Sequence, residues 1–361
     1  MVGVDRRAVL AELEAGPAAN LSRVARKVTI LDVAQAAGVS VATVSKAING
    51  RYGVGSETSA RVMAIVHDLG YESSLVARSL RSRRTGVIGI LVAEFEPFSA
   101  EILKGASAEL HGTQHELLAF AGAPSGGSSG WERRHLARLS GTLIDGAILV
   151  TPSVVDADAD IPLVTIDPHT GPAGLPSVAS DNVFGATMAT RHLIELGHRR
   201  IAFMAGRPDL LSSMQRHEGY ALALTQAGLP VDPSLVKDGS YSREIARKPA
   251  FELLSRPDRP TAVFAANDLS ALGTMDLARE LGLRIPQDLS VIGFDDIPEA
   301  AQARPPLSTV RQQLHRMGRV AVNLLLTLLE DKPLEQASVT LPTSLVRRGT
   351  TAPPPQTRAG A

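Results

Sequence analysis

One stretch near the amino end of the chain carries side chains suited to contacting nucleic acid. Residues 41–49 read VATVSKAIN, and at helical spacing one face of this segment presents small and polar residues: Val41, Ala42, Ser45, Lys46 and Asn49. Small side chains permit close approach, hydroxyl and amide groups form hydrogen bonds, and Lys46 adds a positive charge. We therefore expect this face to fit the major groove of DNA, which is wide enough to admit a helix.

Three short helices are expected to hold this face in place. Thr29 and Asp32 match a capping box, which begins a first helix. Gly38 makes the turn into the second helix, and Ser40 is placed to cap it. A third helix is expected over residues 57–69, behind a serine and ending at a glycine. A plain helical hairpin would show part of the same pattern, so the pattern alone does not establish a DNA-binding module.

Motifs for catalysis and for metal binding are missing from the sequence. The chain has no cysteine, which excludes disulfides, thiolate catalysis and sulfur-ligated metal. His111 and His115 lie four apart, but no HExxH pattern surrounds them. Gly50, Gly53 and Gly55 are not followed by the Gly-Lys-Ser/Thr of a phosphate loop, and there is no GxSxG nucleophile elbow. We expect no catalytic residue, no cofactor, no metal and no enzyme activity.

Composition indicates a globular protein of two or three domains. The chain has 361 residues, 44% of them hydrophobic, and no apolar run approaches the roughly 20 residues of a membrane span. Its amino end has no apolar core of signal-peptide length, so we expect a cytoplasmic protein with no membrane contact. The net charge of zero hides an asymmetry, because residues 1–85 hold twelve Lys and Arg against seven Asp and Glu. A basic amino end on an acidic body suggests a nucleic-acid-binding module.

The amino-terminal pattern also matches a known family. The run VTILDVAQAAGVSVATVSKAING, residues 28–50, closely resembles the helix-turn-helix headpiece of the lactose-repressor (LacI/GalR) family. The resemblance implies that three side chains read bases, Val41, Ala42 and Lys46. It implies that four others hold phosphates or orient the helix, Thr29, Ser40, Ser45 and Asn49. Lys46 can donate to guanine O6 or N7, whereas many family members have arginine there, which makes a firmer bidentate contact.

The segment SSLVARSLRSRRTG, residues 73–86, follows the headpiece. In the family the equivalent stretch forms a hinge helix, here about 74–82, that orders on operator DNA. The resemblance places Leu80 in the minor groove at the dyad of a dimer, where an apolar wedge unstacks a base step and bends the DNA. It implies that Ala77 permits close packing of the paired hinge helices. Family members commonly have Pro-Asn where this chain has Ser73 and Ser74, and either serine can cap the helix.

From Gly86 onward, apolar runs alternate with amphipathic helical stretches. The expected strands are VIGILVA, ELLAF, GAILV, PLVTI, RIAFMAG, TAVFAAN and LSVIGFD. Near-continuous apolar strands separated by helices predict an α/β architecture with parallel sheets buried on both faces. Ligands of such folds bind at the carboxyl ends of strands, so the loops after the strands are the candidate binding sites.

The family resemblance extends to about residue 349 and implies a two-lobed, periplasmic-binding-protein-like (type I) domain with three crossovers between the lobes. It places four polar residues in the cleft between the lobes, Asp181, Arg216, Asn267 and Asp295. It also places Glu96 and Phe98, in the turn after the first strand, near the ligand. Carboxylates, an amide and a guanidinium suit the hydroxyls of a sugar, each of which donates and accepts, and an aromatic face suits the C–H side of a pyranose.

Structural roles remain open for the same side chains. The alternatives are a helix cap for Asp181, a turn for Asp295 and a surface ion pair with Glu218 for Arg216. Phe294, just before Asp295, suits the core equally well. Asn267 and Asp268 are adjacent at the start of an expected helix. We expect Asp268 to cap that helix and Asn267 to face the ligand.

The sequence thus predicts an all-α headpiece followed by an α/β sensing domain. The expected division is an extension at 1–27, the DNA-binding domain with its hinge helix at 28–84, the sensing and dimerisation domain at 85–349, and a disordered tail at 350–361. We expect a homodimeric repressor of carbohydrate genes that binds a palindromic operator and is released by a mono- or oligosaccharide. The alternative is the same regulator using a corepressor, a purine or a phosphorylated metabolite. A transport-type sugar receptor would lack the headpiece.

Overall fold

The structure of the chain is a computed structural model that describes residues 28–48, 52–71, 84–122, 131–140, 142–152, 160–169 and 174–355. Several expected features lie outside the described residues: the extension 1–27, Asn49, the hinge segment 74–82 with Ala77 and Leu80, and residues 356–361. The chain divides into two compact units, Met1–Ala77 and Arg78–Ala361. Among the described helices, none is long and apolar enough to span a membrane.

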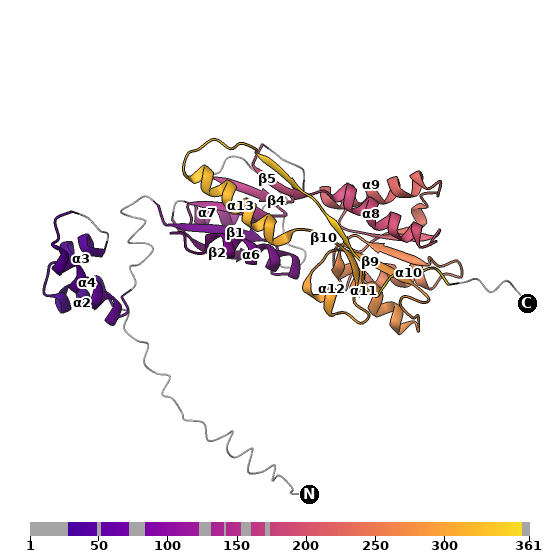
Figure 1. The fold of residues 1–361 in the computed structure, drawn as a ribbon, viewed down its shortest axis with the longest axis horizontal. Helices are drawn as coiled ribbons and strands as arrows, with labels where there is room; N and C mark the ends of the chain where they lie inside the picture. The colour runs from indigo at the N-terminus through magenta and orange to yellow at the C-terminus, as the bar shows by residue number, and fades with distance from the viewer. Residues whose placement is uncertain are drawn as a thin grey trace, which may run out of the picture. The chain divides into compact units, whose positions relative to one another are not determined.

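The amino-terminal unit contains the three predicted helices (Figure 1). They are α2 (Ile30–Ala37), α3 (Val41–Ile48) and α4 (Ser56–Asp68). The capping box is confirmed, because Asp32 accepts from the backbone N–H of Thr29 at 2.7 Å and donates its own N–H to the Thr29 hydroxyl. Gly38 ends α2 with a φ of 63°, in the left-handed region that glycine tolerates. Ser40 caps α3 as predicted, since its Oγ accepts from the N–H of Thr43 at 3.1 Å.

One small core joins these helices. Each helix contributes one fully buried valine, namely Val33, Val44 and Val62. The third helix begins one residue earlier than predicted, because Gly55 occupies its N-cap position and Ser56 is its first residue. The core fixes the angle between α2 and α3, and so determines which side of α3 is left exposed.

The larger unit is built on two sheets of six strands each, which define two lobes. Lobe 1 has the strand order β11-β5-β4-β3-β1-β2, and all of its strand pairs are parallel. Its strands are β1 (Val87–Val92), β2 (Glu116–Ala121), β3 (Gly146–Val150), β4 (Leu163–Ile166), β5 (Ser177–Ser180) and β11 (Ser338–Leu341). Helices α6 (Pro97–Leu110) and α13 (Leu314–Leu329) cover one face, and α7 (Trp131–Leu139) covers the other.

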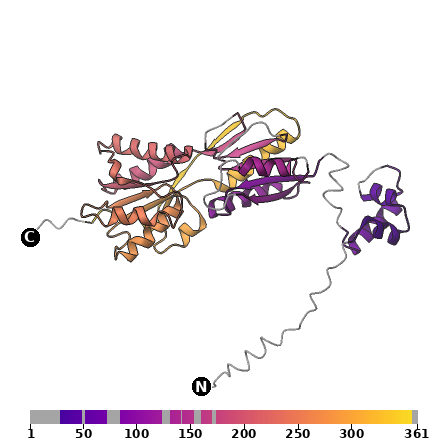
Figure 2. The same cartoon turned by 180° about the vertical axis from the view of Figure 1, so that it is seen from behind.

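Lobe 2 has the strand order β12-β10-β9-β8-β6-β7. Its strands are β6 (Ile201–Ala205), β7 (Val236–Asp238), β8 (Ala262–Ala265), β9 (Ser290–Asp295), β10 (Ser308–Arg311) and β12 (Ser344–Val346). Helices α8 (Asn182–Glu195) and α9 (Leu211–Gln226) lie on one face of this sheet, and α10 (Arg247–Leu254) and α11 (Asp268–Glu280) lie on the other (Figures 1 and 2). The short helices η1 (Pro233–Leu235) and α12 (Pro298–Gln302) complete the lobe.

The chain crosses between the lobes three times, as the family resemblance implies. The crossings lie between β5 and α8, between β10 and α13, and between β11 and β12. Direct hydrogen bonds tie them together. The N–H of Asp181 donates to the carbonyl of Leu341 at 3.0 Å, and the Thr343 hydroxyl donates to the carbonyl of Asp181 at 3.3 Å. Gln313 donates its side-chain amide to the carbonyl of Pro342 at 2.9 Å. We call these three crossing segments the hinge, and hydrogen bonds connect all three.

Glycines allow the backbones of two pairs of helices to approach each other closely. A Cβ on Gly318 of α13 would lie 2.2 Å from the carbonyl oxygen of Ile102 on α6, and a Cβ on Gly105 would meet the backbone of His315. A Cβ on Gly219 of α9 would likewise lie 2.4 Å from a carbonyl oxygen of α8. Real Cβ atoms do not approach so closely, so these positions require glycine.

The structure differs from the sequence prediction at the sheet edges. The seven predicted strands are present, but β2 is an exposed edge strand rather than a buried one, and five short strands were not predicted. Strand β12 pairs antiparallel with β10.

The packed structure also continues past residue 349. Thr350 is fully buried, accepts from the N–H of Ser308 at 2.8 Å and donates to the carbonyl of Val291 at 2.6 Å.

Candidate functional site

The exposed face of α3 carries the residues expected to contact DNA. Ala42 and Lys46 are exposed and lie one helical turn apart, while Val41 and Ser45 are half-buried beside them. Val44 on the opposite side is fully buried in the headpiece core. The helix therefore presents small residues and one cation on a single surface. The base-reading roles of Val41, Ala42 and Lys46 remain predictions.

Two of the side chains expected to hold phosphates are engaged in capping. The Thr29 hydroxyl donates to Asp32 at 2.7 Å, and the Ser40 hydroxyl lies 2.9 Å from that of Thr43. Both residues are exposed, so their backbone and remaining hydroxyl capacity face solvent. These two residues orient the helices, whether or not they also touch phosphate.

In the larger unit, Arg216 on α9 lies at the centre of a buried polar cluster. Its side chain is 3% exposed. Its Nε donates to Asn182 Oδ1 at 2.9 Å, and its Nη1 donates to the carbonyl of Ala266 at 2.5 Å and lies 3.5 Å from Asp295 Oδ1. Its guanidinium also lies 3.9 Å from the ring centroid of Phe294, a cation–π contact. The alternative surface pairing of Arg216 with Glu218 is thus not what the structure shows.

Asp295 ends β9 in a strained backbone conformation within this cluster. Its φ is 118°, which L-residues rarely adopt and which is common at binding sites. Its Oδ1 accepts from Gln312 Nε2 at 2.7 Å. Burial raises the pKa of Asp295 to about 7, the nearby Asp167 adds to the rise, and Arg216 opposes it. The carboxyl group can therefore exist near neutrality as both donor and acceptor.

Carboxyl groups from lobe 1 face this cluster. Asp167, directly after β4, is buried, and burial raises its pKa against the opposing charge of Arg216. Glu96, half-buried at the start of α6, has its pKa raised to about 7 by burial and by the charges of Asp295 and Glu94. Both lobes thus contribute acids around one guanidinium, at the carboxyl ends of the strands, where ligands of parallel α/β folds bind.

The other expected cleft residues have structural partners. Asp181 accepts from the N–H of Phe184 at 3.0 Å and caps α8. Phe98 belongs to the core of lobe 1. The prediction that Asp268 caps α11 was wrong, because Asn267 is the N-cap and its Oδ1 accepts from the N–H of Ser270 at 2.9 Å. That Asn267 also contacts the ligand stays a prediction.

Asp268 instead lies in the core of lobe 2. Its Oδ1 accepts from the Thr309 hydroxyl at 2.6 Å, and its Oδ2 accepts from the N–H of Ile297 at 3.0 Å. These bonds join α11 to β10 and to the loop after β9. The two carboxylate oxygens of Asp268 accept one of these bonds each, so they are not available to cap α11.

Sequence reasoning missed four residues of the cluster, Asp167, Asn182, Tyr241 and Gln312. One of them, Gln312, has a buried side-chain oxygen, Oε1, with no hydrogen-bond partner in the described part of the chain. Such atoms are uncommon in folded proteins and suit a ligand. Asp167 directly follows the predicted strand PLVTI, so the rule that ligands bind after parallel strands was the available signal.

Comparison with known sequences identifies both units. Residues 29–74 match the profile of bacterial regulatory proteins of the lacI family, and residues 190–351 match a periplasmic binding protein-like domain. The repressor PurR of Vibrio atlanticus (strain LGP32) is 34% identical over 330 residues, which cover 89% of this chain and 98% of that protein.

Solved structures agree with this assignment. The transcriptional regulator CelR in complex with cellobiose is 33% identical with a TM-score of 0.67, covering 90% of this chain and 99% of that one. The lac repressor dimer bound to operator and the anti-inducer ONPF is 27% identical with a TM-score of 0.79, covering 91% and 100%. The expected fold is thereby confirmed. The headpiece, the two-lobed domain and these relatives together establish that the chain belongs to the lacI family of DNA-binding, non-enzymatic transcriptional repressors.

Proposed function

We propose that this repressor responds to a purine base bound in the cleft between its lobes, and that it acts as a homodimer on a palindromic operator. One observation carries the effector assignment. Arg216 is buried beside two acids, Asp295 and Asp167, whose pKa values are raised. The edge of a purine such as guanine presents acceptors next to donors. A guanidinium pairs with the acceptors and a carboxyl group with the donors.

Aromatic side chains near Arg216 support a planar ligand. The ring of Tyr241 lies 5.6 Å from the guanidinium, and the ring of Phe294 packs against it. The unpartnered Oε1 of Gln312, whose amide group donates to Asp295, would supply one further acceptor. The PurR relatives, at 33–36% identity, are purine-responsive, which favours the same ligand class here.

A sugar is the second candidate, and one observation favours it. The similar structure of CelR holds cellobiose. Buried carboxyl, amide and guanidinium groups also suit sugar hydroxyls. The cluster around Arg216 therefore serves as the site for either ligand, and a direct comparison of the two classes is needed.

For the DNA side, we propose that Val41, Ala42 and Lys46 read bases in each half-site. Thr29, Ser40, Ser45 and Asn49 would fix the orientation of the headpiece, and the hinge residues Ala77 and Leu80 would act at the central minor groove. Lys46, the one cation among the described residues of α3, is the side chain suited to donate to guanine O6 or N7 in each half-site.

Fluorescence anisotropy tests the effector assignment. The full chain is titrated onto DNA from upstream of its own gene, with guanine, hypoxanthine or cellobiose added. We expect a purine to change the operator dissociation constant by about tenfold, within the usual range of allosteric coupling. Asp295→Asn should reduce this response, whereas the control Asp258→Asn, at an exposed surface ion pair, should keep it. A response to cellobiose and none to either purine would contradict the proposal and support a sugar.

A further inference from the structure

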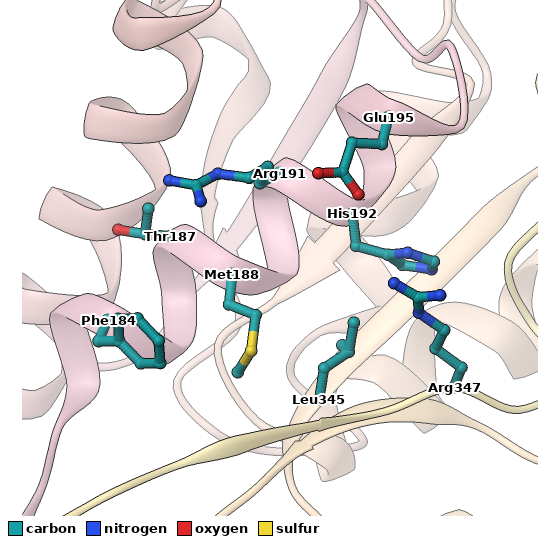
Figure 3. Close-up of a pocket in the computed structure, with 8 residues that line it drawn as sticks. All are labelled: Phe184, Thr187, Met188, Arg191, His192, Glu195, Leu345 and Arg347. Carbon is teal, nitrogen blue, oxygen red and sulfur yellow. The ribbon is translucent and has the colours of Figure 1, made fainter.

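Lobe 2 contains a cavity whose lining residues differ from those of the cluster around Arg216. It has a volume of about 590 Å³ and lies between α8 and β12 (Figure 3). Cavities of roughly 300–1,000 Å³ are typical of small-molecule sites. None of its lining residues belongs to the polar cluster described above. The cavity is therefore a separate feature of the lobe.

One wall of the cavity is apolar. It is formed by Phe184 and Met188 of α8 and by Leu345 of β12, which lie toward the same side in Figure 3. Phe184 is 56% exposed, although it is a large aromatic residue on a well-packed helix. Met188 and Leu345 are half-buried. An exposed phenyl ring with two aliphatic neighbours in a concave surface is suited to the hydrocarbon part of a ligand.

The other end of the cavity carries excess positive charge. Arg347 is exposed and has no hydrogen bond or ion pair to any described residue, and its guanidinium lies beside His192 in Figure 3. Arg191 makes one long bond, 3.3 Å, to Gln226. Burial and the charge of Arg347 lower the pKa of His192, so this imidazole is neutral near pH 7. Glu195 is the single acid in the lining, which leaves a net charge of about +1.

We propose that this cavity binds a small amphipathic carboxylate, with its hydrocarbon part against Phe184, Met188 and Leu345 and its carboxylate on Arg347. A guanidinium presents two parallel N–H groups that match the two oxygens of a carboxylate. Since Arg347 lacks a partner among the described residues, no ion pair within that part of the chain has to be broken to bind the ligand. This site does not depend on which effector occupies the cleft.

The cavity is connected to the effector cluster through α8. A Cβ on Gly185, next to Phe184, would lie 2.9 Å from the ring of Phe294 and 2.8 Å from the Thr343 hydroxyl in the hinge. Phe294 in turn packs on the guanidinium of Arg216. A ligand that shifts α8 against β12 therefore moves a helix in direct contact with both the hinge and the effector cluster. We infer that the carboxylate site modulates effector affinity.

Saturation-transfer NMR of the full chain with sodium octanoate tests the site. We expect a dissociation constant of about 1 mM or lower, weakened about tenfold in Arg347→Gln and abolished in Leu345→Asp. Arg316→Gln, an exposed arginine on α13, is the matched control and should bind as the unmodified chain does. Octylammonium, with the same hydrocarbon and the opposite charge, should not bind. Absence of octanoate binding, equal binding by Arg347→Gln, or equal binding of octylammonium would each overturn the proposal.

Coupling to the cleft is tested separately by measuring guanine affinity with and without saturating octanoate. We expect a change of about fivefold or more that disappears in Arg347→Gln. A change below twofold, with octanoate bound, would refute the regulatory role. If guanine does not bind at all, the purine proposal fails while the octanoate titration still decides the carboxylate site.

Discussion

The buried carboxyl of Asp295 makes the stability of the protein fall as pH rises through neutrality. Its pKa is raised to about 7 in the folded chain, mainly by burial, and returns to an ordinary value near 3.8 on unfolding. Between these two values the folded chain holds a proton that the unfolded chain has lost. The free energy of unfolding therefore decreases with increasing pH in this interval. The substitution Asp295→Asn removes the titration and retains an oxygen for Gln312, which donates to it at 2.7 Å.

The comparison with Asp295→Asn between pH 6.5 and pH 8 isolates this effect. Burial lowers the pKa values of His169, His192 and His198, so below about pH 6.5 these side chains change stability in the opposite direction. Their unfolded forms still lose protons just above pH 6.5, and Glu96, with its pKa raised to about 7, titrates in the same interval, so the contribution of Asp295 is the difference between the unmodified chain and Asp295→Asn. With a folded pKa of about 7, linkage predicts that Asp295 contributes a loss of about 0.8 kcal/mol between pH 6.5 and pH 8.

Urea denaturation followed by circular dichroism measures this difference. The free energy of unfolding is determined at pH 6.5, 7, 7.5 and 8 for the unmodified chain and for Asp295→Asn. We expect the decline with pH to be smaller in the variant by about 0.8 kcal/mol. Asp258→Asn, an exposed residue with an ordinary surface partner, should keep the full decline. Equal slopes for the unmodified chain and Asp295→Asn would refute the assignment of a raised pKa to this carboxyl.

Three further substitutions test other parts of the molecule. Leu80→Ala, at the proposed minor-groove wedge, should weaken operator binding at least tenfold in anisotropy while effector affinity stays within twofold; unchanged operator affinity would refute the wedge. Arg216→Met should abolish the effector response and lower the unfolding free energy by about 3 kcal/mol in urea, because Asp167 and Asp295 lose their buried cation. A retained response would move the effector site elsewhere. Gly318→Val should cost about 3 kcal/mol, since a Cβ there would lie 2.2 Å from a carbonyl oxygen of α6, and a loss below about 0.5 kcal/mol would contradict the close packing.

Local signals in the sequence were sufficient for the headpiece. Its signals are the capping box at Thr29 and Asp32, the left-handed Gly38 and the cap at Ser40. Each depends only on residues at most four positions away, so each can be recognised from the sequence alone. The long apolar strands were predictable for the same reason, because burial on both faces requires continuous apolar residues. The edge strand β2 was predicted to be buried because its residues are apolar, and only the strand order shows that it lies at the edge.

The effector cluster was only partly predictable. Arg216 and Asp295 were identified through the family resemblance, and the structure brings them within 3.5 Å of each other although 79 residues separate them. Asp167 joins them from the end of a predicted lobe 1 strand, which was the available signal, whereas no local pattern indicates Gln312 in a hinge crossing. The cap of α11 was assigned to Asp268 instead of Asn267, because either side chain can cap a helix and only the hydrogen bond of buried Asp268 with Thr309 decides between them.

The sequence by itself determined the family, the helix-turn-helix headpiece and the α/β sensing domain, since periodicity, caps and turns are properties of neighbouring residues. Only the tertiary structure decided which charges meet. Arg216 is the centre of a buried acidic cluster instead of a surface residue because the chain crosses between two lobes. The same crossings leave Arg347 beside an apolar cavity, without a partner among the described residues. Electrostatic interactions depend on distance in space and on burial, and neither quantity is encoded by spacing along the chain.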